Sequence, residues 1–210
     1  MNYIENIYTC LAAPLLVAFF CARADRTRMS LICVFSGMTA CLLSSYISTY
    51  LAAVYGIDHA TTSVTISPLV EEIMKFLPVL FYLLVFEPKK EEIPGCVIVT
   101  ATGFATFENV CYMIQNGSSD FFDLLLRGFG TGAMHIICSV IIFTGIVYLW
   151  EHLWLRVAGT FGLLVTSVAY HGIYNMMVMQ SYISVVIAGC LIPLISGILF
   201  IIFVRYPGTR

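Results

Sequence analysis

Hydrophobic runs, each about as long as a membrane-spanning helix, recur from one end of the chain to the other. About twenty apolar residues cross the hydrocarbon core of a bilayer as an α-helix. The short apolar piece at 121–127 is placed outside the fifth run, as an interfacial or re-entrant segment, because including it would give a helix near thirty residues long. The pattern predicts an all-α, polytopic integral membrane protein with about seven transmembrane helices, at residues 3–22, 30–54, 68–86, 94–115, 128–149, 157–179 and 182–204.

Composition supports lipid as the surroundings of this chain. Of its 210 residues, 60% are hydrophobic and only 10% are charged, and the mean hydropathy is +0.94. A soluble domain carries about 25% charged residues. Ten Lys and Arg stand against twelve Asp and Glu, so there is no basic excess, and we expect no nucleic-acid partner. Seven helices use up the length, which predicts a single transmembrane helical domain over 1–210.

The basic residues predict the orientation, because Lys and Arg are retained on the cytoplasmic side of a membrane. The opposite connections, around 56–67, 116–120 and 180–182, contain no basic residue. We therefore expect the N-terminus outside and the C-terminus in the cytoplasm. Eight basic residues follow the first, third, fifth and seventh predicted helices: Arg23, Arg26, Arg28, Lys89, Lys90, Arg156, Arg205 and Arg210.

A few polar residues interrupt the predicted helices, and each costs roughly 2.5 kcal/mol or more at mid-bilayer unless it has a partner. With a rise of about 1.5 Å per helical residue, all of them fall within roughly 10 Å of depth in the outer half of the membrane. This agreement predicts one shared polar cavity. Its candidate residues are Glu71, Glu72 and Lys75 from the third helix, Glu108 from the fourth, His135 from the fifth, and His171 and Asn175 from the sixth.

Each of these residues also has a purely structural explanation. Glu71 and Lys75 lie four residues apart on one helix face and are expected to meet, as an ion pair that holds two helices together. A single histidine, His135 or His171, is often a packing residue, and Asn175 is a typical interhelical hydrogen-bond donor. Their common depth favours a functional site.

Hydrolysis is the first chemical hypothesis for such a cavity. Glu71, Glu72 and Glu108 are carboxyls screened from bulk water and are candidate general bases near neutral pH. His171 and Asn175 lie on the same helix face, where they can donate hydrogen bonds to the oxyanion of a tetrahedral intermediate.

A family resemblance becomes specific at these residues. The chain contains Glu71-Glu72-x-x-Lys75, then Gly-Phe-Ala-x-x-Glu-Asn ending at Glu108 and Asn109, then His135, then His171-x-x-x-Asn175. This ordered set, over about residues 67–175, resembles the PrsW family of intramembrane proteases, which is related to the CAAX-prenyl endopeptidases and Abi proteins.

The resemblance implies a protease in the plasma membrane of a bacterium, with a catalytic core at about 67–179. Its implied partner is a single-span membrane protein such as an anti-sigma factor, cut first on the extracytoplasmic side in a stress response. The implied roles are water activation by Glu71 with Glu72, and oxyanion binding by His171 and Asn175. The prenyl-endopeptidase relatives have histidine at the position of Glu108. Its role therefore stays open between positioning water, sharing a proton with Glu71 and binding a metal, and a CAAX substrate is disfavoured.

Two alternatives to this glutamic-type protease remain at the level of the sequence. A zinc-dependent protease would use the same cavity, with Glu72, Glu108, His135 and His171 as candidate ligands. No His-Glu-x-x-His motif is present, so no cofactor is favoured, and zinc is the alternative. A proton-coupled transporter or a non-enzymatic scaffold is the third hypothesis, although the chain shows no internal repeat of the kind such transporters carry.

Overall fold

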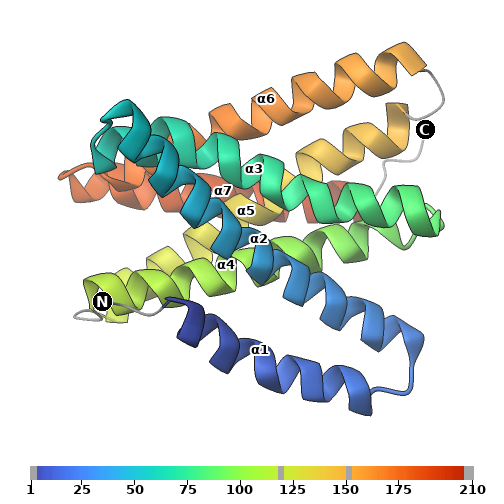
Figure 1. Cartoon of the computed structure of the whole chain (residues 1–210). Coiled ribbons are helices and arrows are strands. Elements are labelled where there is room, and N and C mark those ends of the chain that lie inside the picture. The colour runs from blue at the N-terminus through green and yellow to red at the C-terminus, as the bar shows by residue number, and fades with distance from the viewer. Residues whose placement is uncertain (1–3, 118–120, 150–152, 206–210) are drawn as a thin grey trace.

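The computed structural model describes residues 4–117, 121–149 and 153–205 and contains seven α-helices in these ranges (Figure 1). The all-helical prediction is confirmed. The helices are α1 (Ile4–Cys21), α2 (Asp25–Tyr55), α3 (His59–Phe86), α4 (Ile93–Asn116), α5 (Phe121–Leu149), α6 (Leu153–Val178) and α7 (Ile183–Arg205).

Six of the helices in the described ranges are long and apolar enough to cross a membrane, and α3 is the exception. Its 28 residues would span about 42 Å, so its length is sufficient. It differs from the others because Glu71, Glu72 and Lys75 lie near its middle. The protein is therefore a polytopic membrane protein in which α3 carries charged residues near its middle.

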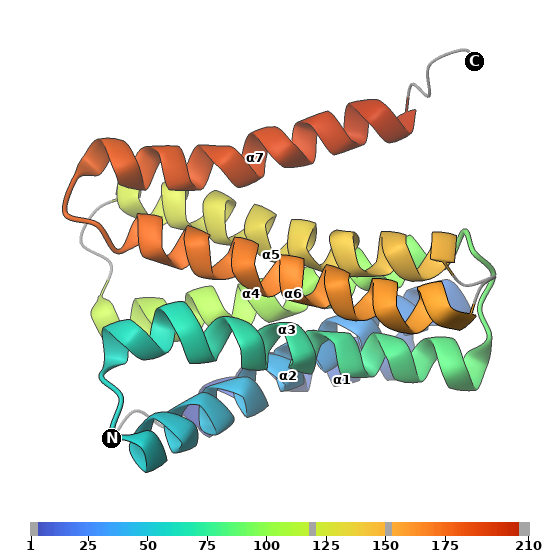
Figure 2. The ribbon, with the colours of Figure 1, turned by 90° about the horizontal axis from the view of Figure 1, so that it is seen from above.

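The helices that carry the candidate residues lie at the centre of the bundle. α3 packs against α2, α6, α4 and α5, and α5 packs against α6, α4 and α7. Viewed from above, α7 lies along one edge of the bundle, while α1 and α2 lie along the other (Figure 2). Residues from α3, α4, α5 and α6 can therefore meet in the interior, shielded by the flanking helices.

α2 crosses α4 at very short range, near the middle of both helices (Figure 1). A Cβ atom on Gly37 would lie 2.0 Å from the carbonyl oxygen of Thr100, and one on Gly103 would lie 2.3 Å from that of Val34. Only glycine at both positions permits this crossing. Beyond it the C-terminal halves of the two helices diverge (Figure 1).

The starts of two helices differ most from the sequence prediction. α3 begins at His59 rather than at residue 68, and Asp58 caps it by accepting a hydrogen bond of 3.0 Å from the Thr61 amide. Hydrogen bonds from the Thr61 hydroxyl and amide keep the pKa of Asp58 below its usual value. The polar stretch that we expected as a connection therefore forms the first turns of a helix, and about three turns separate His59 from Glu71.

The placement of 121–127 outside the fifth helix is wrong. These residues form the first two turns of α5, which is 29 residues long. Apolar runs locate only the part of a helix that lies in hydrocarbon, and a helix longer than the bilayer is accommodated by tilting or by projecting beyond it. His135 therefore lies about four turns into its helix, not two.

Candidate active site

The structure brings the candidate residues of four helices together. Glu72, Lys75, His135 and His171 are between 0% and 3% exposed and form a connected set of hydrogen bonds. Buried ionisable groups are stable in a protein interior only when they are paired. This set is therefore the polar centre of an otherwise apolar bundle.

Glu72 is the hub of this set. Its Oε1 atom accepts hydrogen bonds from Lys75 Nζ at 2.7 Å and from His171 Nδ1 at 2.8 Å. The expected pairing of Lys75 with Glu71 is wrong, because Lys75 turns to the residue three positions away instead of four. With Nδ1 bearing the proton that Glu72 accepts, the lone pair of His171 Nε2 faces Glu71, whose Oε2 lies 3.7 Å away.

His135 is held between a cation and a carboxylate. Lys75 Nζ lies 2.8 Å from His135 Nδ1, and His135 Nε2 lies 2.5 Å from Glu108 Oε2. The Phe104 ring packs against the imidazole with 4.9 Å between ring centres. Because the Lys75 ammonium can only donate, we assign the ring proton to Nε2, from which it is donated to Glu108.

Arg127 belongs to the site, although the sequence favoured it as an interfacial anchor and kept a position at the rim of the cavity as the alternative. Its Nη2 atom lies 3.3 Å from Glu108 Oε1, and its guanidinium carbon lies 3.5 Å from the centre of the Tyr112 ring. The structure places Arg127 at the cavity, in contact with Glu108. The signal in the sequence is that Arg127 and Lys75 are the two basic residues that do not follow the orientation pattern.

Asn175 joins α6 to α3 instead of standing free. Its Nδ2 atom donates a hydrogen bond of 2.8 Å to the carbonyl oxygen of Ser63. Nearby, a Cβ atom on Gly172 would lie 2.9 Å from the carbonyl oxygen of Val64. Pro68 has no N–H to donate to that oxygen within the helix, and this leaves room for α6 to approach α3 closely. The close approach places His171 beside Glu72.

A cavity of about 640 Å³ adjoins these residues. Glu71, Glu108, Arg127 and Asn175 line it, together with residues from the diverging halves of α2 and α4. Other lining residues lie at helix ends whose connections carry no basic residue: Ile57, His59, Gln115 and Met179. The cavity therefore extends from that end of the bundle to the buried carboxylates.

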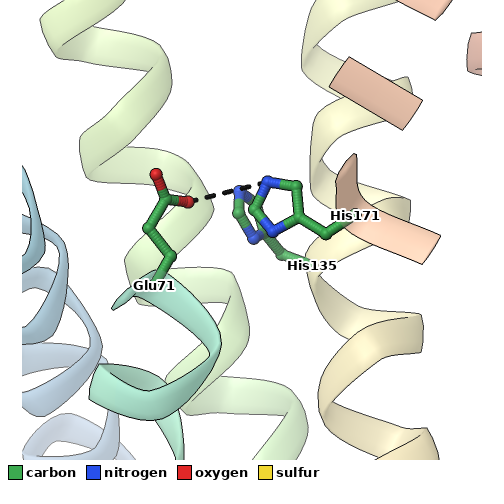
Figure 3. A group of neighbouring side chains, drawn as sticks. All are labelled: Glu71, His135 and His171. Atoms are coloured by element: carbon green, nitrogen blue, oxygen red, sulfur yellow. Dashed lines mark ion pairs between the residues drawn. The ribbon is translucent and has the colours of Figure 1, made fainter. Parts of the chain in front are cut away.

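Three of the residues can hold a metal ion. Glu71, His135 and His171 each offer a ligand atom, and these atoms lie within 4.8 Å of one another (Figure 3). The Oε2 atom of Glu71 is buried and has no hydrogen-bond partner among the described residues. Two imidazoles and one carboxylate are a ligand set that zinc uses in catalytic sites. The residues therefore fit a zinc ion at this point.

The group that could hold a metal ion contains a glutamate that was not among the candidate ligands. Glu72 and Glu108 were candidate ligands, whereas Glu71 completes the group with His135 and His171. Glu72 instead supports His171 from the far side of the ring, and Glu108 contacts His135. Which of two adjacent glutamates faces a cavity depends on the rotation of the helix, and spacing along the sequence leaves that rotation undetermined.

Comparison with known proteins agrees with this site. Residues 25–205 match the family model described as PrsW family intramembrane metalloprotease. Comparison with curated proteins and with solved structures found no match. The resemblance inferred from the sequence is confirmed, while the preference for a glutamic-type enzyme over a metal-dependent one is not supported. The chain therefore belongs to the PrsW family of intramembrane metalloproteases, because the family model covers residues 25–205 and the chain contains the Glu-His-His group.

Proposed function

We propose that the protein is a zinc-dependent endopeptidase that cuts a single-span membrane protein within the 640 Å³ cavity. The observation that carries this proposal is the group of Glu71, His135 and His171, whose ligand atoms meet beside the cavity. A peptide bond within the membrane is shielded from water, so its hydrolysis needs a polar opening into the helix bundle. The cavity supplies that opening.

Glu71, His135 and His171 would hold the ion. Zinc in such a site polarises the carbonyl of the scissile bond and lowers the pKa of a bound water. The chain's own contribution is to keep the ligands in register. Glu72 fixes the tautomer of His171, so that Nε2 is unprotonated on the side of Glu71.

Glu108 acts as the general base in this proposal. It lines the cavity beside the ligand group, and Arg127 holds its Oε1 atom while His135 contacts its Oε2 atom. A carboxylate at this position takes the proton from the attacking water and returns it to the leaving amine. For His135 Nε2 to act as a ligand, Lys75 would give a proton to Nδ1 while the Nε2 proton passes through Glu108 to water, so the ring stays neutral and Glu108 is again a carboxylate.

Asn175 is the proposed oxyanion donor. One of its two amide hydrogens is used on the Ser63 carbonyl, and the other is free to meet the oxygen of a tetrahedral intermediate. Both ring nitrogens of His171 face carboxylates, so this residue contributes to the ligand group rather than to the oxyanion.

We further propose that the cut is extracytoplasmic and that the substrate is a single-span protein such as an anti-sigma factor in a bacterial plasma membrane. The cavity reaches the end of the bundle whose connections lack Lys and Arg, and the positive-inside rule assigns that end to the outside. The kind of substrate follows from the family resemblance.

The test uses purified protein in liposomes with a panel of tagged single-span proteins that includes anti-sigma factors. We expect one zinc per chain by elemental analysis, cleavage that a chelator stops and added zinc restores, and loss of both zinc and cleavage in Glu71→Gln. Glu92→Gln is the matched control, since Glu92 is exposed at the other end of the bundle. Glu71→Gln protein that keeps its zinc and its activity would contradict the proposal.

A further inference from the structure

One side of the cavity is lined by hydroxyl groups, and nothing above uses them. α2 contributes four of them and α3 another three, and we call the set the hydroxyl wall: Ser44, Ser45, Ser48, Thr49, Thr62, Ser63 and Ser67. Positions 63, 67 and 71 follow one another at intervals of four, as do 44 and 48, so each row lies along one helix face. The row on α3 leads directly to Glu71.

Three of these hydroxyls have a local partner for their hydrogen. Ser44 donates to the Cys41 carbonyl, Thr62 to that of Asp58 and Ser63 to that of His59, at 2.8–2.9 Å. A hydroxyl oxygen that donates its hydrogen still has lone pairs that accept. These three side chains therefore present acceptors along the cavity.

Ser48 is different and carries the argument. It is 5% exposed and lines the cavity, and its hydroxyl has no hydrogen-bond partner among the described residues. A serine inside a helix ordinarily bonds to the carbonyl four residues earlier, as Ser36 does to Ile32. A buried hydroxyl without a partner costs free energy, and a functional role explains its retention.

α4 and the end of α6 bring apolar side chains to the same cavity. Phe107, Cys111 and Tyr112 lie on α4 beside Glu108 and Gln115, while Val178 and Met179 lie near the end of α6, which packs on α3. The cavity is thus a groove that offers both hydroxyl groups and apolar surface close to Glu71 and Glu108.

We propose that the hydroxyl wall binds the main chain of the substrate as an extended strand, with Ser48 donating to a substrate carbonyl. This inference rests on the proposed function. A peptide bond within a helix is already hydrogen-bonded, so a span must unwind before it is cut, and its freed N–H and C=O groups need partners in a membrane. Ser44 and Ser63 accept from substrate N–H groups. Alternate side chains of a strand point to opposite sides, so every second residue packs against the apolar residues of α4.

The substrate class follows from this arrangement. The cleaved segment is the end of a transmembrane helix that unwinds readily, with large apolar residues at alternate positions. A phospholipid headgroup is the competing occupant. However, the carboxylates of Glu71 and Glu108 line the cavity, and the guanidinium of Arg127 that also lines it is already paired with Glu108. The charge balance therefore disfavours a phosphate.

The test measures binding, separately from cleavage. The probe is a fluorescent single-span peptide of about 30 residues with leucines at alternate positions near one end. It is titrated into Glu71→Gln protein in detergent, with and without Ser48→Ala, and Ser36→Ala is the matched control on the same helix. We expect Ser48→Ala to weaken binding about five- to tenfold, the worth of one hydrogen bond, and Ser36→Ala to leave it unchanged. Binding within twofold of the parent would overturn the proposal.

Two further measurements separate a binding role from a structural one. Ser48→Ala removes an unpartnered hydroxyl, so its melting temperature should equal or exceed that of the parent, and a lower melting temperature would assign Ser48 to folding and overturn the proposal. Replacing one substrate amide by an ester should weaken binding to the parent but have less effect on Ser48→Ala, because the two changes remove the same contact. Fully additive effects would contradict the proposed contact.

The outcomes also distinguish this inference from the proposed function. If the wild-type protein cleaves its substrate and Ser48→Ala cleaves it equally well, the inference is overturned and the proposed function is not. Binding that depends on Ser48, without cleavage of any probe, supports the groove and contradicts the protease. Displacement of the peptide by phosphatidylglycerol, with lipid binding lost in Ser48→Ala, would assign the wall to lipid and overturn the inference.

Discussion

Glu72 Oε1 accepts a hydrogen bond from His171 Nδ1 at 2.8 Å, and this contact determines which nitrogen of His171 faces Glu71. Carboxylates behind a ligand histidine hold the ring in one tautomer and one orientation. Glu72 also pairs with Lys75, so one carboxylate serves both the histidine and the buried ammonium. The adjacent glutamates of the motif therefore have different tasks, Glu71 toward the cavity and Glu72 toward the interior.

Glu72→Gln should weaken zinc binding by about 10- to 100-fold, because the amide is a poorer acceptor for the His171 N–H. It should also destabilise the fold by about 3–5 kcal/mol, since it leaves the Lys75 ammonium buried without a counter-ion. Zinc affinity measured by chelator competition and thermal unfolding in detergent check the two effects. Lys75→Met added to Glu72→Gln should recover part of the stability but none of the zinc affinity.

Arg127→Gln should lower kcat by about 10²-fold or more with little change in zinc content, because Arg127 orients Glu108 but is not in the Glu-His-His group. Arg127→Lys should recover part of this loss. Arg28→Gln is the control. Arg28 also lies over an aromatic ring, that of Phe19, but it is not one of the site residues. An unchanged kcat in Arg127→Gln would remove Arg127 from the positioning of Glu108.

Gly103→Val should destabilise the bundle by about 1–3 kcal/mol or more, because a side chain there meets the Val34 backbone on α2. Gly95→Ala lies in the same helix, and a Cβ there meets nothing within 4 Å. That control should be neutral or slightly stabilising, since alanine is the better helix former. Equal melting temperatures for the two variants would contradict the close crossing of α2 and α4.

Labelling by a membrane-impermeant thiol reagent tests the orientation. We expect a cysteine at Ser181 to react from outside intact cells and a cysteine at Glu91 to react only after the cells are opened, because the basic residues flank the second position. Both positions are exposed between helices, so the pair is matched for accessibility. Labelling in the opposite sense would place the cavity on the cytoplasmic side.

The sequence by itself determined the class of the protein and most of the polar residues that the structure brings together. Runs of about twenty apolar residues located the seven helices of the described residues. A single segment in hydrocarbon must be helical, because its backbone N–H and C=O groups have no water to bond with and must pair within the segment. The cost of burying charge made Glu71, Glu72, Glu108, His135 and His171 stand out, since residues of this kind are rare within spans and need partners.

Only the tertiary structure decided how these residues are paired. The rotation of α3 turns Glu71 to the cavity and Glu72 to Lys75 and His171, although the two glutamates are neighbours in sequence. The full length of α5 brings Arg127 onto Glu108, and the short apolar piece at 121–127 does not by itself show that those first two turns belong to the helix. Helix rotation, helix ends and the unpartnered hydroxyl of Ser48 all depend on packing between distant segments. Local patterns do not encode that packing, because the free energy that selects it comes from contacts between helices.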